Sequence, residues 1–139
     1  YQGGVGQWLA DLGIDLIIGG HPHVVQDYEV LTAADGRRVP VMYALGNLIS
    51  NQRWENSNGG IITMVDIDRQ TKRVVNIDYI PVYVHKGKLL NERRQYYCIP
   101  TTDYLSGQLP FRLPNDSVEQ ELMLFYNNTM NRIPATPVE

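Results

Sequence analysis

The sequence predicts a mixed α+β fold, built mainly of β-strands with helices beside them. Three observations lead to this prediction. A short helical pattern runs through a glycine into an apolar, β-rich segment, which is an order typical of α/β layers. Several short β-rich segments then follow one another between polar turns. The last segment with a clear period is an amphipathic helix, and the 139 residues suffice for one domain with one core.

The elements expected in the first part of the chain are a helix at 6–12 and strands at 14–18, 24–31 and 39–45. The helix is predicted from Trp8, Leu9 and Leu12, which recur at helical spacing, and from Gly13, which is a natural stop. The first strand is apolar and β-rich throughout, which is typical of a buried strand.

The elements expected next are a hairpin of strands at 61–68 and 74–84, a strand at 95–99, an irregular segment at 100–114, a helix at 117–132 and a frayed tail at 134–139. The hairpin is predicted from the polar turn at 69–72. Asp116 or Ser117 is expected to cap the helix. Its mostly apolar stripe consists of Val118, Leu122, Phe125 and Thr129.

Composition limits the function classes. Hydrophobic residues make up 43% of the chain and charged residues 19%, as in an ordinary globular protein. The net charge is −3 and the basic residues are scattered or paired, which argues against nucleic acid as a partner. The single cysteine, Cys98, cannot form a disulfide within the chain and is expected to be a packing residue. The chain begins at Tyr1 rather than Met, so we expect a fragment or a processed chain.

The most informative segment directly follows the predicted buried strand and reads Gly19-Gly20-His21-Pro22-His23. The carboxyl ends of such strands are where α/β proteins place their sites. Pro22 favours an extended conformation at His21, and an extended His-x-His places both imidazoles on one side of the chain. That arrangement suits two neighbouring divalent ions, one imidazole reaching each, and both rings can also chelate a single ion.

Other interpretations of the two histidines remain open. A pair of histidines on a surface turn can be solvated without binding anything. A cupin metal site also uses His-x-His with a nearby glutamate, but Glu29 lies slightly too far along the chain and a helix precedes the motif.

Three further residues are weighed as site candidates. Asn47 follows a glycine at a strand end, where its amide could orient a metal-bound water or support His21, or simply tolerate a tight turn. Arg53 stands in a polar loop, where it could bind a substrate phosphate or carboxylate with two hydrogen bonds, or remain solvated. His85 stands beside a turn and is expected to be exposed rather than a ligand.

Two stretches of the sequence together resemble the motifs of a known family. The first reads Gly13-Ile14-Asp15-Leu16-Ile17-Ile18-Gly19-Gly20-His21-Pro22-His23-Val24-Val25-Gln26, and the second reads Tyr43-Ala44-Leu45-Gly46-Asn47-Leu48. They resemble the Gly-x-Asp-x-x-x-Gly-x-His-Pro-His-x-x-Gln and Tyr-Ser-Leu-Gly-Asn-Phe motifs of the CapA-like family of poly-γ-glutamate capsule-biosynthesis proteins. The resemblance covers about residues 13–84, with Ala44 and Leu48 as mild departures.

The resemblance implies a fold of the calcineurin-like metallophosphatase superfamily, in which two β-sheets pack face to face between helices. This chain would be the C-terminal portion of that four-layer α/β/β/α sandwich. Residues 1–85 would belong to the capsule-synthesis domain, and residues 86–139 would form a C-terminal extension with a terminal helix. His21 would bind one ion and His23 the other, in a divalent pair of Zn, Mn or Fe.

The implied activity is metal-dependent phosphoester hydrolysis in the synthesis or export of an anionic polymer. The family's earlier ligand motifs are absent, so the metal pair would be incomplete and the chain inactive alone. The resemblance also implies a membrane-associated place at the cell surface or in the periplasm, beside a membrane-bound synthase complex. A non-enzymatic scaffold in that complex and a general metallophosphoesterase are the alternatives. An exposed sheet face could also lead the chain to form homo-oligomers.

Overall fold

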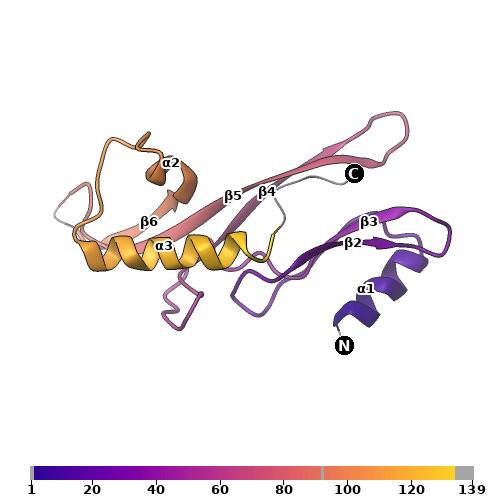
Figure 1. Cartoon of the computed structure of the whole chain (residues 1–139), viewed down its shortest axis with the longest axis horizontal. Coiled ribbons are helices and arrows are strands. Elements are labelled where there is room, and N and C mark those ends of the chain that lie inside the picture. Colours follow the sequence, from indigo (N-terminus) through magenta and orange to yellow (C-terminus); the bar gives the residue numbers. More distant parts are fainter. Residues whose placement is uncertain (1, 92, 134–139) are drawn as a thin grey trace.

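A computed structural model describes residues 2–91 and 93–133 and shows a mixed α+β fold, as predicted (Figure 1). The described elements are, in order, α1 (Gln2–Asp11), β1 (Ile17–Ile18), β2 (Tyr28–Thr32), β3 (Arg38–Met42), β4 (Gly59–Ile67), β5 (Val74–Gly87), β6 (Gln95–Pro100), α2 (Thr101–Leu105) and α3 (Asp116–Met130). Each sheet in this part of the chain has three strands.

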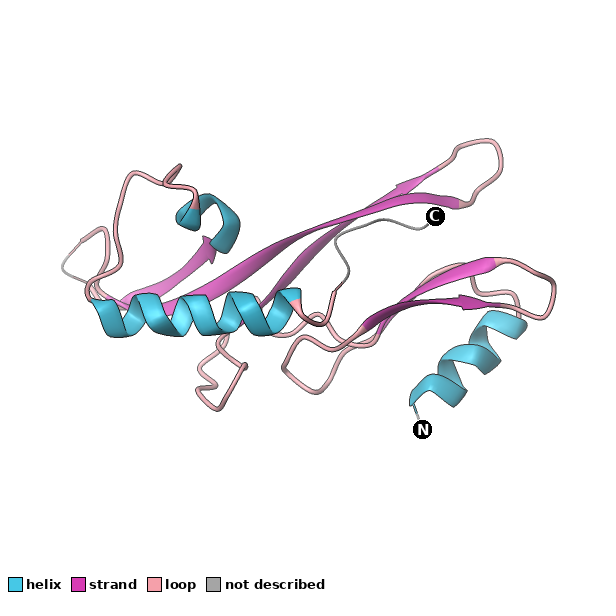
Figure 2. Ribbon diagram, viewed as in Figure 1, coloured by secondary structure: helices cyan, strands magenta, loops and turns pink. Residues whose placement is uncertain are grey.

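The first sheet has the strand order β1-β3-β2, with β1 parallel and β2 antiparallel to β3. Helix α1 lies beside this sheet (Figure 2) and packs its buried Ala10 against Ala33 and Val39. Arg37 fastens the helix to the turn between β2 and β3, because its guanidinium donates to Ala10 O (2.8 Å) and to Asp15 Oδ1 (2.9 Å). The guanidinium is thereby a second donor to the Ala10 carbonyl at the helix end, which also accepts from Gly13 N over 3.1 Å.

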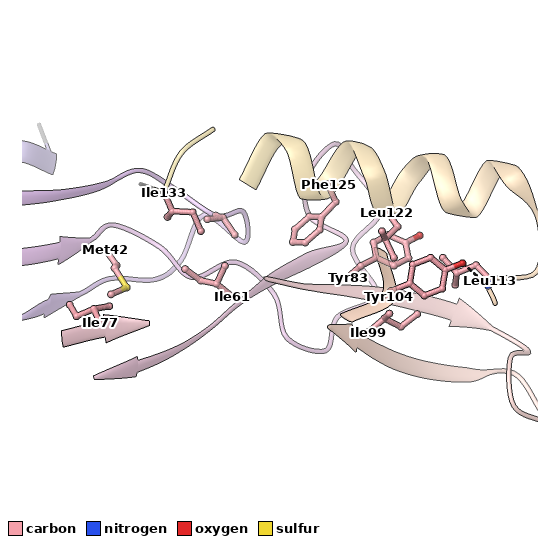
Figure 3. Packing of buried hydrophobic residues seen from close by; sticks show 11 residues of the cluster. Met42, Ile61, Ile77, Tyr83, Ile99, Tyr104, Leu113, Leu122, Phe125 and Ile133 are labelled. Carbon is pink, nitrogen blue, oxygen red and sulfur yellow. Dashed lines mark hydrogen bonds between the residues drawn. The ribbon is translucent and has the colours of Figure 1, made fainter. Parts of the chain in front are cut away.

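The second sheet is an antiparallel meander with the order β4-β5-β6. Helix α3 runs along β5 (Figure 1) and buries Leu122 and Phe125 against Tyr83 and other core side chains. Figure 3 shows that this core extends from the second sheet towards Met42 at the end of β3. One continuous core therefore joins the two sheets.

A glycine crossing links the two sheets. Gly46 has φ +76°, and a Cβ there would lie 2.7 Å from Gly59 O. A Cβ on Gly60 would lie 2.6 Å from Leu45 O. The two backbone segments are this close because Asn47 N donates to Gly59 O over 2.8 Å. Only glycine, which has no Cβ, fits at these positions. The crossing fixes where Asn47 enters the candidate site.

The first part of the chain differs from the sequence expectations in several elements. The strand predicted at 24–31 begins only at Tyr28, and the strand predicted at 39–45 ends at Met42. Helix α1 begins at Gln2, four residues before the predicted start, because Gly3 and Gly4 weaken the helical signal there. The buried strand predicted at 14–18 was wrong: β1 has two residues, and Ile18 is 48% exposed. An apolar run indicates a strand but does not indicate whether another element packs against it. No described element covers Ile18.

The C-terminal part brings further corrections. Residues 101–105 form the short helix α2 inside the segment expected to be irregular. The cap of α3 is Asn115 rather than Asp116 or Ser117, and its Oδ1 accepts from Val118 N over 3.1 Å. The hairpin, the strand at β6 and the apolar stripe of α3 are confirmed. The predicted tail at 134–139 lies outside the described residues, and no described helix is long and apolar enough to cross a membrane.

The division of the chain at residues 85 and 86 stays a prediction. Strand β5 runs from Val74 to Gly87 and pairs with β6 through the register Lys86↔Tyr96. The strands on either side of the predicted boundary are therefore hydrogen-bonded in one sheet.

Candidate metal site

The two candidate histidines lie in the bend that follows β1. Gly19 N donates to Met42 O over 2.7 Å, and a Cβ on Gly19 would lie 2.3 Å from Tyr43 O. The backbone after β1 is therefore in close contact with the end of β3. It then turns sharply, with φ +100° at His21 and +60° at His23. The extended conformation predicted for His21 was therefore wrong. Positive φ is uncommon for residues other than glycine, and such backbone strain concentrates at functional sites.

The bend nevertheless places the two imidazoles side by side. Both residues are exposed, and their ring centroids lie 6.5 Å apart with the planes tilted by 44°. An imidazole nitrogen binds a metal ion at about 2.0–2.1 Å, and paired catalytic ions stand about 3.5–4 Å apart. Rings at this separation can each reach one ion of such a pair.

Asn47 orients the His23 ring through a hydrogen bond. The side chain of Asn47 is buried, with 7% of the residue exposed, and its Oδ1 lies 2.8 Å from His23 Nδ1. Its Nδ2 faces three oxygens, His23 O (3.0 Å), Gln52 Oε1 (2.9 Å) and Ser57 O (2.8 Å). Because an amide nitrogen must face acceptors, Oδ1 is the atom that meets the imidazole.

This contact determines the tautomer of His23. Asn47 Oδ1 is an acceptor, so the proton of a neutral His23 must sit on Nδ1, and the lone pair remains on Nε2. A metal-binding histidine usually donates its other ring N–H to an oxygen in this way. The structure thus pairs Asn47 with His23, whereas the sequence had suggested support for His21.

Trp54 is a residue of the site that the sequence reasoning missed. Its ring meets that of His23 edge to face, with 6.4 Å between centroids, and 54% of the residue is exposed. The available signal was a tryptophan in an otherwise polar loop, between the Leu45-Gly46-Asn47 stretch and the glycine pair that opens β4. Gln52, from the same loop, was missed as well.

The remaining candidates lie apart from the histidine pair. Arg53 donates to Gln52 O (2.9 Å) and lies over the Tyr96 ring, and neither contact involves an imidazole. His85 was expected to be exposed, but it is buried at 6% exposure and stacks on Tyr97, because β6 and α3 both pack around this part of β5. Burial lowers the pKa of His85.

Cys98 also differs from its expected packing role. It is exposed on β6, where its Sγ lies 3.1 Å from Leu48 O, and partial burial of the thiol raises its pKa. The reason is its position on the outer strand of the second sheet, where β6 pairs on one side with β5.

The described residues contain no complete set of metal ligands. Within 2–91 and 93–133, no three His, Cys, Asp or Glu side chains are placed to hold one ion together. His21 and His23 therefore supply two nitrogen donors, and Nε2 of His23 is available as a ligand. These donors fit Zn, Mn or Fe as partial ligands.

Comparisons with known proteins agree with the motifs. Residues 1–52 match the family model described as bacterial capsule synthesis protein PGA_cap. The capsule biosynthesis protein CapA of Bacillus anthracis is 27% identical over 79 residues, which is 57% of this chain and 18% of that protein. The PGA biosynthesis protein CapA of Bacillus subtilis (strain 168) is 27% identical over 80 residues, 57% of this chain and 19% of that protein.

The aligned region spans less than a fifth of either relative's length, and no solved structure matches this chain. The family match includes both histidines, Asn47 and the first sheet that positions them. The part of the chain that carries the candidate site is therefore similar to bacterial capsule-biosynthesis proteins of the CapA-like family.

Proposed function

We propose that the complete protein is a metal-dependent phosphoesterase-like enzyme of capsule biosynthesis, in which His21 and His23 each bind one of two divalent ions. The observation that carries the proposal is the buried Asn47 amide, which holds His23 with its Nε2 lone pair free. A histidine that is merely solvated on a surface turn needs no such fixed orientation.

The residues of this chain would bind the two ions and orient the ligand atoms. His23 Nε2 is the donor atom towards one ion, and Asn47 keeps that atom in place. The exposed ring of His21 stands 6.5 Å away and serves the second ion, while Trp54 shields the edge of His23 from water on one side. An ion pair bound there would lower the pKa of a shared water and neutralise charge on a phosphoryl oxygen.

The proposal concerns the complete protein. Two imidazoles are fewer ligands than two ions require, so further ligands must come from residues outside those described. The 139-residue chain alone should show no hydrolysis. The substrate of the complete protein would be a phosphoester linked to an anionic polymer, and its place a membrane-bound synthase complex.

The test compares the full-length protein with its His21→Ala and His23→Ala variants. Each variant should lose about one ion of the pair by elemental analysis, and hydrolysis of an aryl phosphate should fall by at least about a hundredfold. The matched control is His85→Gln, because His85 is the third histidine and its ring stacks on Tyr97 of the neighbouring strand.

Three outcomes would decide between the candidate functions. Unchanged metal content and rate in both variants would refute the proposal. Two bound ions without turnover over a broad phosphoester panel would favour a scaffold role. Hydrolysis that depends on the histidines, in a protein whose deletion leaves capsule formation intact, would favour a general phosphoesterase.

A further inference from the structure

The loop at 48–58 contributes to a second cluster of polar side chains, which lies apart from the histidine pair. Arg53 Cζ lies 5.9 Å and Lys86 Nζ 5.4 Å from the centroid of the Tyr96 ring. Asn51 Oδ1 accepts from both Lys86 Nζ and Tyr96 Oη, the latter over 3.0 Å. Residues from the loop and from both strands of the β5–β6 hairpin therefore meet at one ring.

The two cations of this cluster lack a carboxylate partner among the described residues. Lys86 hydrogen-bonds to an amide oxygen, and Arg53 donates to the backbone oxygen of Gln52 and lies over the Tyr96 ring. Two like charges held against one ring repel each other unless an anion joins them. Lys86 keeps N–H donors to spare, and Arg53 keeps most of its guanidinium donors.

A line of hydrogen bonds connects this cluster to the candidate metal site. His23 donates to Asn47 (2.8 Å), Asn47 Nδ2 donates to Gln52 Oε1 (2.9 Å), and Arg53 donates to Gln52 O (2.9 Å). Trp54, the neighbour of Arg53 in sequence, touches the His23 ring. Arg53 thus stands on the same loop that positions the imidazole, and Asn51 of that loop accepts a hydrogen bond from Lys86 of β5.

A cavity of about 310 Å³ lies beside Arg53. Its lining includes two carboxylates, those of Glu55 and Glu121, besides Arg53, Trp54, Asn56, Asn58, Leu124 and Phe125. Because these carboxylates repel anions, an anion bound by Arg53 would lie on the side of Tyr96 and Lys86 rather than in this cavity.

From these contacts we propose that Arg53 and Lys86, held against Tyr96, form an oxyanion subsite that binds an anionic group of the substrate beyond the histidine pair. The guanidinium fork suits a carboxylate or a phosphoryl group with two hydrogen bonds, and the lysine adds a second charge. That the anion belongs to the substrate rests on the proposed function, whereas the subsite itself does not.

The test measures anion binding to the 139-residue chain without added metal. The probes are inorganic phosphate and an oligoglutamate peptide, followed by calorimetry and by the NMR signals of the Tyr96 ring and the Arg53 Nε–H. Saturable binding should weaken about tenfold with Arg53→Gln and with Lys86→Gln, and it should weaken further at high salt. Binding of phosphate alone assigns a phosphoryl group to the subsite, and binding of oligoglutamate alone assigns a carboxylate.

The matched controls are Arg69→Gln and Lys72→Gln, which remove the same charges from the exposed turn between β4 and β5. Equal weakening by these controls would show diffuse charge attraction and overturn the subsite, as would the absence of saturable binding. His21→Ala should leave anion binding unchanged. Loss of hydrolysis in the His21→Ala full-length protein, with no effect of Arg53→Gln on anion binding, would leave the proposed function standing and refute the subsite alone.

Discussion

His23 Nδ1 donates to Asn47 Oδ1 over 2.8 Å, and through this bond the two sequence motifs of the chain meet. The histidine comes from the bend after β1, and the asparagine comes from the glycine crossing between the sheets. The sheet architecture therefore sets which nitrogen of His23 faces outward. A polar contact that selects one tautomer makes the imidazole a better-defined ligand than a free surface histidine.

Replacing Asn47 with leucine should destabilise the protein and disorder His23. The change leaves His23 O and Ser57 O without the Nδ2 donor. Because Asn47 is only 7% exposed, water cannot replace that donor, and the free energy of unfolding should fall by about 2–3 kcal/mol. Urea denaturation measures the stability, and metal titration of the full-length protein should show about a 10–100-fold weaker affinity.

The control for Asn47→Leu is Asn127→Leu on the exposed side of α3, which should change the free energy of unfolding by no more than about 0.5 kcal/mol. Equal effects of the two substitutions, or an Asn47→Leu protein with wild-type metal affinity, would contradict the role given to Asn47.

The glycine crossing should not tolerate a side chain. Gly46→Ala would place a Cβ 2.7 Å from Gly59 O on a residue with φ +76°, so we expect a loss of at least about 2 kcal/mol. Gly4→Ala is the matched control: its Cβ meets nothing within 4 Å inside α1, and it should stabilise the protein by about 0.5–1 kcal/mol. Thermal unfolding measures both, and a neutral Gly46→Ala would show that the crossing can relax.

Much of the site was predictable because glycine and histidine carry positional information. The bend residues and Asn47 stand in short motifs. A Cβ on Gly19 or Gly46 would collide with backbone, whereas at Gly13 the positive φ of +102° favours glycine. The partnership of Asn47 with His23 was not predictable, since it depends on how the two sheets cross.

Burial was the harder property to predict from the sequence. Ile18 was expected to be buried and His85 to be exposed, and both predictions were wrong. The apolar run around Ile18 indicates a strand but does not say what covers it. His85 lies near the end of a long strand whose second face is covered by residues distant in sequence, so its environment depends on tertiary packing.

Phe125→Ala should cost much more stability than Leu124→Ala, although the two residues are adjacent on α3. Phe125 is 2% exposed, packs on Tyr83 and lies where a Cβ on Gly59 would be 2.5 Å from its ring, so its removal should cost about 3–5 kcal/mol. Leu124 is 55% exposed, and its truncation should cost about 0.5 kcal/mol or less.

Chemical denaturation of the two variants checks this prediction. Because Gly59 O accepts from Asn47 N, Phe125→Ala should also broaden or shift the NMR signals of the His23 ring, whereas Leu124→Ala should not. Similar costs for both truncations would mean that α3 does not contribute to the core as the structure shows.

Protonation of His85 should make the protein less stable in mild acid. Burial is the largest cause that lowers its pKa in the folded state, and Arg53 lowers it further, against opposing effects of the Lys88 backbone and Glu121. The unfolded chain, with a pKa near 6.5, then binds more protons than the folded one. Stability contributed by neutral His85 is complete above that pKa and is lost as the pH falls below it, until the lowered folded pKa is passed.

Urea denaturation between pH 7.5 and pH 5.5 tests this prediction against His85→Gln, which has no proton to gain. The wild-type free energy of unfolding should decline relative to the variant as the pH falls below about 6.5. Carboxylates titrate alike in both proteins, so they cancel in the difference. Nε2 of His85 has no hydrogen-bond partner in the structure, and a Cβ on Gly87 would lie 2.5 Å from it, so little room exists for water to solvate a charged ring. Parallel pH profiles for the two proteins would contradict the prediction, because they would mean that the folded state solvates a protonated His85.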